Sequence, residues 1–237
     1  MDMSGKDDKL PSSRGGGDVQ AFLDKLSAMP SIQTGGGRGR LIFAMDATAS
    51  REPTWDNACH IQGEMFLATE GLGGLEVQLV FYRGFGECKS SPWVSSSVDL
   101  VRRMTAVTCL GGRTQIGKIF KHTLRQTEKQ RVNALVFVGD CIEEDVDALC
   151  DLAGKLGVLG IPVFAFQEGA DPAATMGFRQ FARLTGGAHC QFDQGSAEEL
   201  KALLAAVAVF ASGGRKALED YGKRGGAAVA RITSQVK

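Results

Sequence analysis

The stretch Leu41-Ile42-Phe43-Ala44-Met45-Asp46-Ala47-Thr48-Ala49-Ser50 joins an uninterrupted apolar run to one carboxylate and two hydroxyls. The apolar run predicts a short buried strand, and the polar residues then lie where that strand leaves the sheet. Alternate residues of an extended segment point the same way, so Asp46, Thr48 and Ser50 can face one centre. Oxygen ligands of this kind suit Mg²⁺, which prefers octahedral oxygen coordination and keeps several waters. The same residues also fit a capped helix start, and the stretch alone leaves both interpretations open.

From Arg40 onward, apolar runs alternate with segments of helical periodicity, which predicts a mostly parallel sheet flanked by helices. The candidate strands are short apolar runs bounded by Gly, Pro or Asp, and they span residues 41–46, 75–82, 134–139, 161–166 and 188–192. The candidate helices repeat apolar residues every three or four positions, on faces formed by Ala58, Ile61, Met65 and Ala68; by Ile116, Phe120, Thr123 and Thr127; by Val146, Leu149, Ala153 and Leu156; and by Leu200, Leu204, Val207 and Ala211.

A glycine-containing connection, Arg83-Gly84-Phe85-Gly86-Glu87, separates two extended segments at residues 75–82 and 88–94. Such a pair predicts a hairpin, so one edge of the sheet should run antiparallel. We therefore expect a three-layer α/β fold with a mostly parallel six-stranded sheet and one antiparallel edge strand. The layout resembles a dinucleotide-binding architecture without its glycine fingerprint.

The two ends of the chain differ in composition from its centre. Residues 1–39 are polar and glycine-rich, which predicts a flexible segment, although Asp18 can cap a short helix that ends before Pro30. Residues 40–212 form the predicted domain. Residues 213–237 form a basic tail, which we interpret as a solvated, partly helical extension.

The overall composition excludes several classes of partner. Lys plus Arg and Asp plus Glu both number 27 among 237 residues, so no global basic field favours nucleic acid or an anionic membrane. No run approaches the ~20 apolar residues of a membrane span, and the polar start lacks a secretory signal. Six scattered cysteines without a Cys-x-x-Cys pair indicate reduced thiols rather than a zinc or disulfide framework. We expect a cytoplasmic protein.

Two further loops place oxygen ligands beyond a strand or before a helix. The apolar run at residues 134–139 ends in Asp140, as the run at 41–45 ends in Asp46, and Thr114 lies in a glycine-rich loop before the helix near Gln115. Because ligands of open parallel sheets bind beyond the carboxyl ends of the strands, these loops can meet. The candidate metal ligands are Asp46, Thr48, Ser50, Thr114 and Asp140.

These three segments resemble, in order, the metal-ion-dependent adhesion site of the von Willebrand factor type A (VWA) domain: Asp-x-Ser-x-Ser, a distant Thr, then a distant Asp. Residues 181–188 further resemble the late helix and Thr-Gly-Gly turn of that family, and Phe192, Asp193 and Leu200 resemble its last strand and final helix. The resemblance covers residues 40–212. Thr48 replaces the commoner Ser and keeps its hydroxyl, whereas Cys141 follows Asp140 where the family often has Gly.

The resemblance implies a Mg²⁺ site, with Mn²⁺ or Ca²⁺ as substitutes, that binds a partner protein rather than a substrate. Thr48 and Ser50 would be direct ligands, Thr114 would bind directly or through water, and Asp46 and Asp140 would supply charge and orient waters. The open position would accept an Asp or Glu carboxylate of the partner, because two carboxylates shield a dication poorly. The same resemblance implies an adaptor or scaffold protein, with an ATPase or chaperone complex as its candidate partner.

Two enzymatic alternatives compete with this interpretation. Residues 112–118 match the first part of a phosphate-binding P-loop, but Ile119 stands where that motif needs Ser or Thr, and no good strand precedes it. Metal-assisted hydrolysis needs a general base, and His60 and His122 lie too far along their predicted helices from the site. A carboxylate beside Cys141 disfavours its thiolate. We therefore expect a binding module and no enzyme.

Two aromatic residues remain to be placed. Trp55 follows the predicted metal loop closely, where it can either pack at the helix entry or contact a partner at the rim of the site. Trp93 is expected at the edge of the core.

Overall fold

The computed structural model describes residues 38–61, 74–192 and 197–224. The predicted helix after Asp18 and the end of the basic tail lie outside these residues, as do Met65 and Ala68. In chain order the described elements are β1 (Gly39–Asp46), the 3-10 turn η1 (Ala49–Arg51), α2 (Glu52–Ile61), β2 (Leu75–Arg83), β3 (Glu87–Ser90), α4 (Ser97–Met104), α5 (Ile116–Lys129), β4 (Ala134–Gly139), α6 (Val146–Val158), β5 (Val163–Glu168), α7 (Pro172–Thr185), β6 (Ala188–Phe192) and α8 (Ala197–Arg224).

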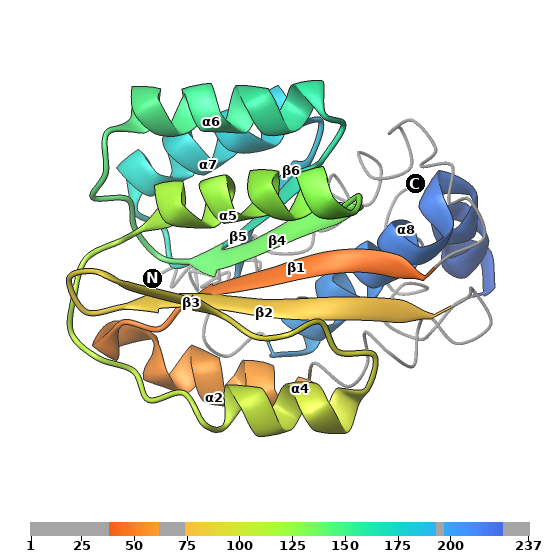
Figure 1. The fold of residues 1–237 in the computed structure, drawn as a ribbon, viewed down its shortest axis with the longest axis horizontal. Helices are drawn as coiled ribbons and strands as arrows, with labels where there is room; N and C mark the ends of the chain where they lie inside the picture. The colour runs from red at the N-terminus through yellow and green to blue at the C-terminus, as the bar shows by residue number, and fades with distance from the viewer. Residues whose placement is uncertain (1–37, 62–73, 193–196, 225–237) are drawn as a thin grey trace, which may run out of the picture.

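The sheet of the described residues has six strands in the order β3-β2-β1-β4-β5-β6 (Figure 1). Strand β1 pairs in parallel with both neighbours, Leu41 lying opposite Val77 of β2 and Ala134 of β4. Strand β3 alone runs antiparallel, beside β2. The predicted fold class is therefore confirmed. From β1 the chain continues to β2 and β3 on one side of β1, and then to β4, β5 and β6 on its other side. The topological switch point therefore lies between β1 and β4, and open α/β sheets bind their ligands at such points.

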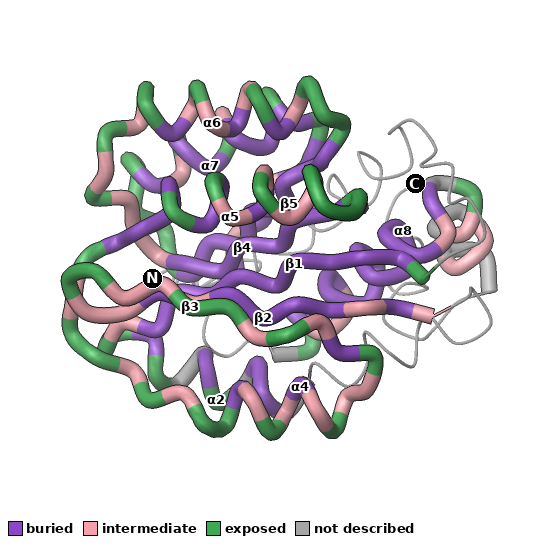
Figure 2. The backbone as a smooth tube through the Cα atoms, in the orientation of Figure 1, coloured by how far each residue is buried: buried purple, intermediate pink, exposed green. Residues whose placement is uncertain are grey.

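Helices cover both faces of this sheet, with α5, α6 and α7 on one face and α2, α4 and α8 on the other (Figure 1). Alternate side chains of β1 point to opposite faces of the sheet and so contribute to both hydrophobic cores. Leu41, Phe43 and Met45 pack on the face covered by α2, α4 and α8, and Ile42 and Ala44 pack on the face covered by α5, α6 and α7. All five are fully buried, and the tube in Figure 2 is continuously purple along the central strands. This two-sided burial explains why β1 is an unbroken apolar run rather than an alternating one.

Several predicted boundaries move in the structure. Strand β5 begins at Val163, two residues later than expected, because the amide of Ile161 donates to Leu156 O at the end of α6. Strand β3 stops at Ser90, and beyond Pro92, which has no amide hydrogen, only Val94 returns to pair with Val77. Helix α8 continues past residue 212 and kinks at Gly214, whose φ is 68°.

The two tryptophans lie against the sheet. Trp55 is 2% exposed, donates from Nε1 to Met104 O at 3.0 Å and meets Phe81 edge to face. It belongs to the core, and the alternative in which it contacts a partner is wrong. Trp93 is half-buried beneath the Arg40 guanidinium, 3.8 Å from its ring centroid, at the edge of the core as expected.

Candidate metal site

Asp46 ends β1 at the switch point of the sheet, and its carboxylate is held from two sides. Its Oδ1 accepts the Thr48 amide at 2.7 Å, and its Oδ2 accepts the Tyr82 hydroxyl at 3.0 Å. Asp46 is 1% exposed. Because both oxygens already accept protein hydrogen bonds, Asp46 is suited to supply charge and to bind water rather than to be a direct ligand. The first bond also curls the loop so that Thr48 and Ser50 follow close by.

Thr48, Ser50 and Asp140 form a cluster of oxygens at this edge of the sheet. Thr48 Oγ1 lies 3.3 Å from Ser50 Oγ, which donates to Asp140 Oδ2 at 3.2 Å across 90 residues of sequence. The other carboxylate oxygen, Asp140 Oδ1, is buried and has no hydrogen-bond partner. Buried carboxylate oxygens are normally satisfied, so this atom indicates a missing ligand. The cluster fits a hard cation held by two hydroxyls and a carboxylate.

The two aspartates also repel each other in the absence of a cation. Burial raises the pKa of Asp46, and the Asp140 charge raises this pKa further, against lowering by the hydrogen bonds from Thr48 and Tyr82. The Cys141 thiol next to Asp140 behaves similarly: burial, followed by the Asp140 charge, raises its pKa to about 12. Cys141 is therefore a thiol at neutral pH. A dication would relieve the electrostatic cost of both carboxylates.

Thr114 lies on a neighbouring loop and bonds elsewhere. Its hydroxyl accepts the Glu143 amide at 2.9 Å, and its own amide donates to Glu143 Oε2 at 2.9 Å. Glu143 follows Asp140 by three residues, so this reciprocal pair ties the Thr114 loop to the Asp140 loop. The structure thus joins Asp46, Thr48, Ser50 and Asp140 by hydrogen bonds and attaches Thr114 through Glu143. Its role as a ligand stays a prediction.

Four residues that support the site were not among the predicted ones. The Tyr82 hydroxyl holds Asp46, and Glu143 and Glu144 hold the loop before α5, with Glu144 accepting the amides of Ile116 and Gly117. The acidic run after Asp140 was a usable signal, because carboxylates favour helix N-termini. Arg51, directly after Ser50, is 1% exposed and pairs with Glu168 at the end of β5. Nothing local predicts that pair, which spans 117 residues.

Glycine backbones bring the Thr114 loop against the β2–β3 turn. The Arg113 amide donates to Gly84 O at 3.1 Å, and the Leu110 amide donates to Ala47 O at 3.0 Å. A Cβ added to Gly112 would overlap the backbone of Gly84, whereas one added to Gly111 would meet open space. The loop position therefore depends on Gly112.

We expect Gly112→Ala to move this loop away from the turn and to weaken Mg²⁺ binding about tenfold, as loss of a supporting contact typically does. Gly111→Ala is the matched control, because the same methyl group is added one residue earlier without a clash. Isothermal titration of both variants with Mg²⁺ measures the effect. Equal affinities for the two variants would show that the Thr114 loop takes no part in the site.

The phosphate-binding alternative does not fit this geometry. The amides of Ile116 and Gly117, which would receive a phosphate at the start of α5, already bond to the Glu144 carboxylate. Lys118 Nζ donates to Gly86 O and to Gln115 Oε1, both at 2.7 Å. An anion would meet a carboxylate at the position where the P-loop cradles its ligand.

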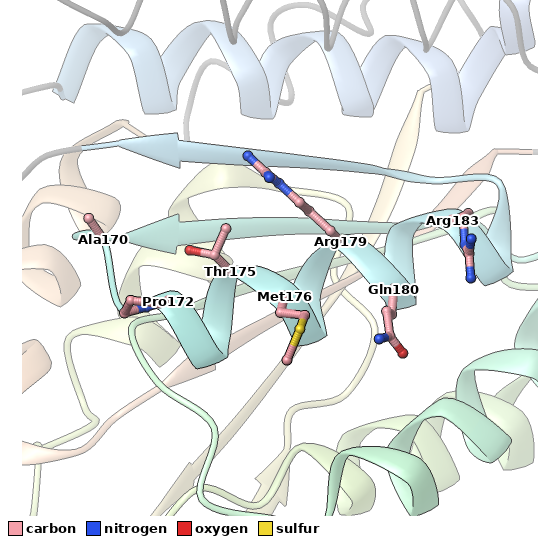
Figure 3. A pocket seen from close by; sticks show the side chains of 7 residues that line it. All are labelled: Ala170, Pro172, Thr175, Met176, Arg179, Gln180 and Arg183. Atoms are coloured by element: carbon pink, nitrogen blue, oxygen red, sulfur yellow. The ribbon is translucent and has the colours of Figure 1, made fainter.

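Other features of the described residues lie apart from the site. No group of three or more His, Cys, Asp or Glu side chains in this part of the chain is placed to hold a metal, so a cation at Asp140 must rely on hydroxyls and water. None of the helices between residues 38 and 224 that the structure describes is both long and apolar enough to cross a bilayer. A cavity of about 520 Å³ follows α7 (Figure 3), and no predicted site residue is among those that line it: Ala170, Pro172, Thr175, Met176, Arg179, Gln180 and Arg183.

Comparison with known proteins places the fold. No family model matches the chain, and no curated protein matches it significantly. Among solved structures, the SpRpn10 VWA domain is similar with a TM-score of 0.54 and 13% identity, covering 72% of this chain and 95% of that domain. Proximal thread matrix protein 1 from the mussel byssus, with a zinc-occupied MIDAS motif, has a TM-score of 0.56 and 14% identity over 73% of this chain and 46% of that protein.

This chain has the fold of a VWA domain. A third VWA-like match, an aerotolerance-related membrane protein from Bacteroides fragilis, has a TM-score of 0.54 and 16% identity over 70% of this chain and 98% of that one. The expected VWA resemblance is confirmed at the level of the fold. Identities this low show the fold alone, and the site of this chain has to be argued from its own residues.

Proposed function

We propose that this VWA domain binds Mg²⁺ through Thr48, Ser50 and Asp140 and uses the ion to capture a carboxylate of a partner protein. Asp46 and Thr114 complete the site through bound water. The observation that carries the proposal is the buried, unpartnered Asp140 Oδ1 beside two hydroxyls that already lie within hydrogen-bonding distance of each other. Three oxygen ligands from the protein leave room for water and for one external group in an octahedral shell.

The charge of the site favours an anionic external ligand. Two carboxylates, Asp46 and Asp140, balance a dication formally, but the charge of Asp46 is shared with the Thr48 amide and the Tyr82 hydroxyl. The ion is therefore incompletely shielded, and a carboxylate is a better sixth ligand than water. Oxygen ligands alone favour Mg²⁺, Mn²⁺ or Ca²⁺ over softer metals.

Binding is favoured over catalysis because the described residues supply no evident base or nucleophile at the ion. His122 Nε2 lies 2.8 Å from Gln78 Oε1, and His189 Nε2 lies 2.9 Å from Gln167 Oε1, so both rings are engaged elsewhere in the sheet. The Cys141 thiol, which follows Asp140 in the chain, has a pKa of about 12. A bound cation would then act as an adhesive contact, and we propose no reaction for it.

The first test is metal binding by the purified protein. We expect Mg²⁺ and Mn²⁺ to bind at one site in isothermal titration and to raise the unfolding temperature, since an ion at 100 times its Kd stabilises the folded state by about 2.7 kcal/mol. Capture from a native lysate with Mg²⁺ or with a chelator then identifies the partner, for which ATPase or chaperone complexes are our first candidates. A partner retained equally in the chelator would reject the proposed function.

A further inference from the structure

A second hollow, of about 160 Å³, lies between the edge strand β3 and helix α5. Four of the residues that line it carry a positive charge, and none carries a negative charge. The lining consists of Val80, Cys88, Lys89, Ser90, Lys118, Lys121, His122 and Arg125. We call this hollow the basic groove. A chain with equal numbers of acidic and basic residues thus has a local excess of cations at this groove.

Most of the cations in the basic groove have no anionic partner. Lys121 and Arg125 are exposed and form no hydrogen bond or ion pair with the described residues, and Lys118 bonds only to neutral oxygens. Lys89 pairs with Glu87 at 2.6 Å, but Glu87 is shared with Arg83. The remaining acid on α5 is the exposed Glu128, near the far end of the helix. The groove therefore has a net positive charge.

The basic groove lies along the helix that follows the Thr114 loop. Helix α5 begins two residues after Thr114, and Lys118, Lys121 and Arg125 are spaced three and four residues apart, along one face. At 1.5 Å per residue, Lys121 and Arg125 lie roughly 10 Å and 16 Å along the chain from Thr114. An extended peptide covers those distances in roughly three to five residues. One short segment can therefore run from the Thr114 loop, which Glu143 ties to the Asp140 loop, to the groove.

We infer that the basic groove selects the partner: the carboxylate that binds the ion belongs to an acidic segment whose next acidic side chains, three to five residues away, lie against Lys121 and Arg125. This inference rests on the proposed function and specifies its partner. A peptide is favoured over nucleic acid, because the groove lining contains no Phe, Tyr or Trp on which bases could stack.

The test compares two synthetic peptides on the full chain in Mg²⁺. Both contain one Asp for the ion; the acidic peptide has Glu at the third to fifth following positions, and the neutral peptide has Gln there. We expect the acidic peptide to bind about tenfold more tightly by fluorescence anisotropy, and the difference to shrink in 1 M salt. Lys121→Glu with Arg125→Glu should remove the difference and leave Mg²⁺ affinity within about twofold.

Arg179→Glu with Arg183→Glu is the matched control, because it makes the same charge change on α7 and should preserve the preference. Equal binding of the two peptides to the unaltered protein would overturn the inference, as would an undiminished preference in the Lys121 and Arg125 variant. If Mg²⁺ binds normally in those cases, the proposed function stands. Peptide binding that persists in a chelator would reject both. Tighter binding of a single-stranded oligonucleotide of equal charge would also overturn the peptide assignment.

Discussion

Replacing Asp46 with asparagine should reduce Mg²⁺ affinity by at least about 100-fold and abolish metal-dependent capture, while the fold is kept. Asparagine is nearly isosteric, so its oxygen and amide can still meet the Thr48 amide and the Tyr82 hydroxyl that hold Asp46. What is lost is the negative charge that the cation requires next to Asp140. Isothermal titration measures the affinity, and thermal unfolding with and without Mg²⁺ measures the stabilisation.

The matched control for this substitution is Asp151→Asn, which removes one charge from an exposed position on α6. It should bind Mg²⁺ like the unaltered protein. Asp46→Ala is expected to lose the metal equally, and in addition to leave the Thr48 amide and the Tyr82 hydroxyl without a partner, which costs about 1–3 kcal/mol of stability each. An Asp46→Asn protein that binds Mg²⁺ normally would remove Asp46 from the site.

The same substitution has a signature in the pH dependence of the metal-free protein. The pKa of Asp46 in the folded state is raised above its ordinary value, chiefly by burial. A raised folded-state pKa means that stability is fully present below the unfolded pKa and is lost as pH rises through the folded pKa. The free energy of unfolding of the metal-free protein should therefore fall as the pH rises from the unfolded-state pKa of Asp46 through its folded-state pKa. The Asp46→Asn protein should lack this contribution to the pH dependence.

The central sheet was predictable because its strands are buried on both faces. A continuous apolar run that ends before an Asp, such as residues 134–139, has few structural interpretations other than a buried strand, and β4 begins and ends where this run does. The positions of Asp46 and Asp140 were predictable for the same reason, since each follows directly from one of these runs. Parallel neighbours then place their carboxyl ends together.

Other elements were hidden by weak local signals. Helix α4 is short and polar, and Val98 on it is 73% exposed, so its apolar periodicity is incomplete. The end of helix α7 was expected from its Thr-Gly-Gly turn, where Gly186 has φ 69°, whereas its start depends on the Asp171 cap, a local signal of only one side chain. Contacts such as Tyr82 with Asp46 join distant residues and depend on the finished sheet register.

The largest effect on stability is expected at the buried ion pair of Arg51, the residue after Ser50. Arg51 and Glu168 are 1% and 7% exposed, and they join η1 to the end of β5. Removing one partner of a buried pair typically costs 3–5 kcal/mol, because the other charge is left uncompensated. Arg51 is already under-satisfied, since Nε and Nη2 have no hydrogen-bond partner. Glu168→Gln should therefore destabilise the protein by about 3 kcal/mol or more, measured by urea unfolding.

Two comparisons make that result specific. Glu87→Gln alters the ion pairs of Glu87 with Arg83 and Lys89 on the edge strand β3, where the Glu87 side chain is 28% exposed. It should change the unfolding midpoint less than Glu168→Gln does, because pairs that water reaches are screened. The double variant Arg51→Met with Glu168→Leu removes both buried charges and should regain most of the lost stability, as replacing a buried pair by apolar residues is often neutral. A Glu168→Gln protein as stable as the unaltered one would show that Arg51 does not depend on this partner.

The double variant also separates stability from metal binding. Arg51 directly follows Ser50, whose hydroxyl donates to Asp140, so the ion pair fixes the turn that presents a proposed ligand. A flexible Met in its place fills the space without that directional anchor. We expect the double variant to unfold near the same urea concentration as the unaltered protein but to bind Mg²⁺ about tenfold more weakly. Loss of a residue that supports the ligands of a metal site commonly has an effect of this size. Unchanged Mg²⁺ affinity would limit Arg51 and Glu168 to a structural role.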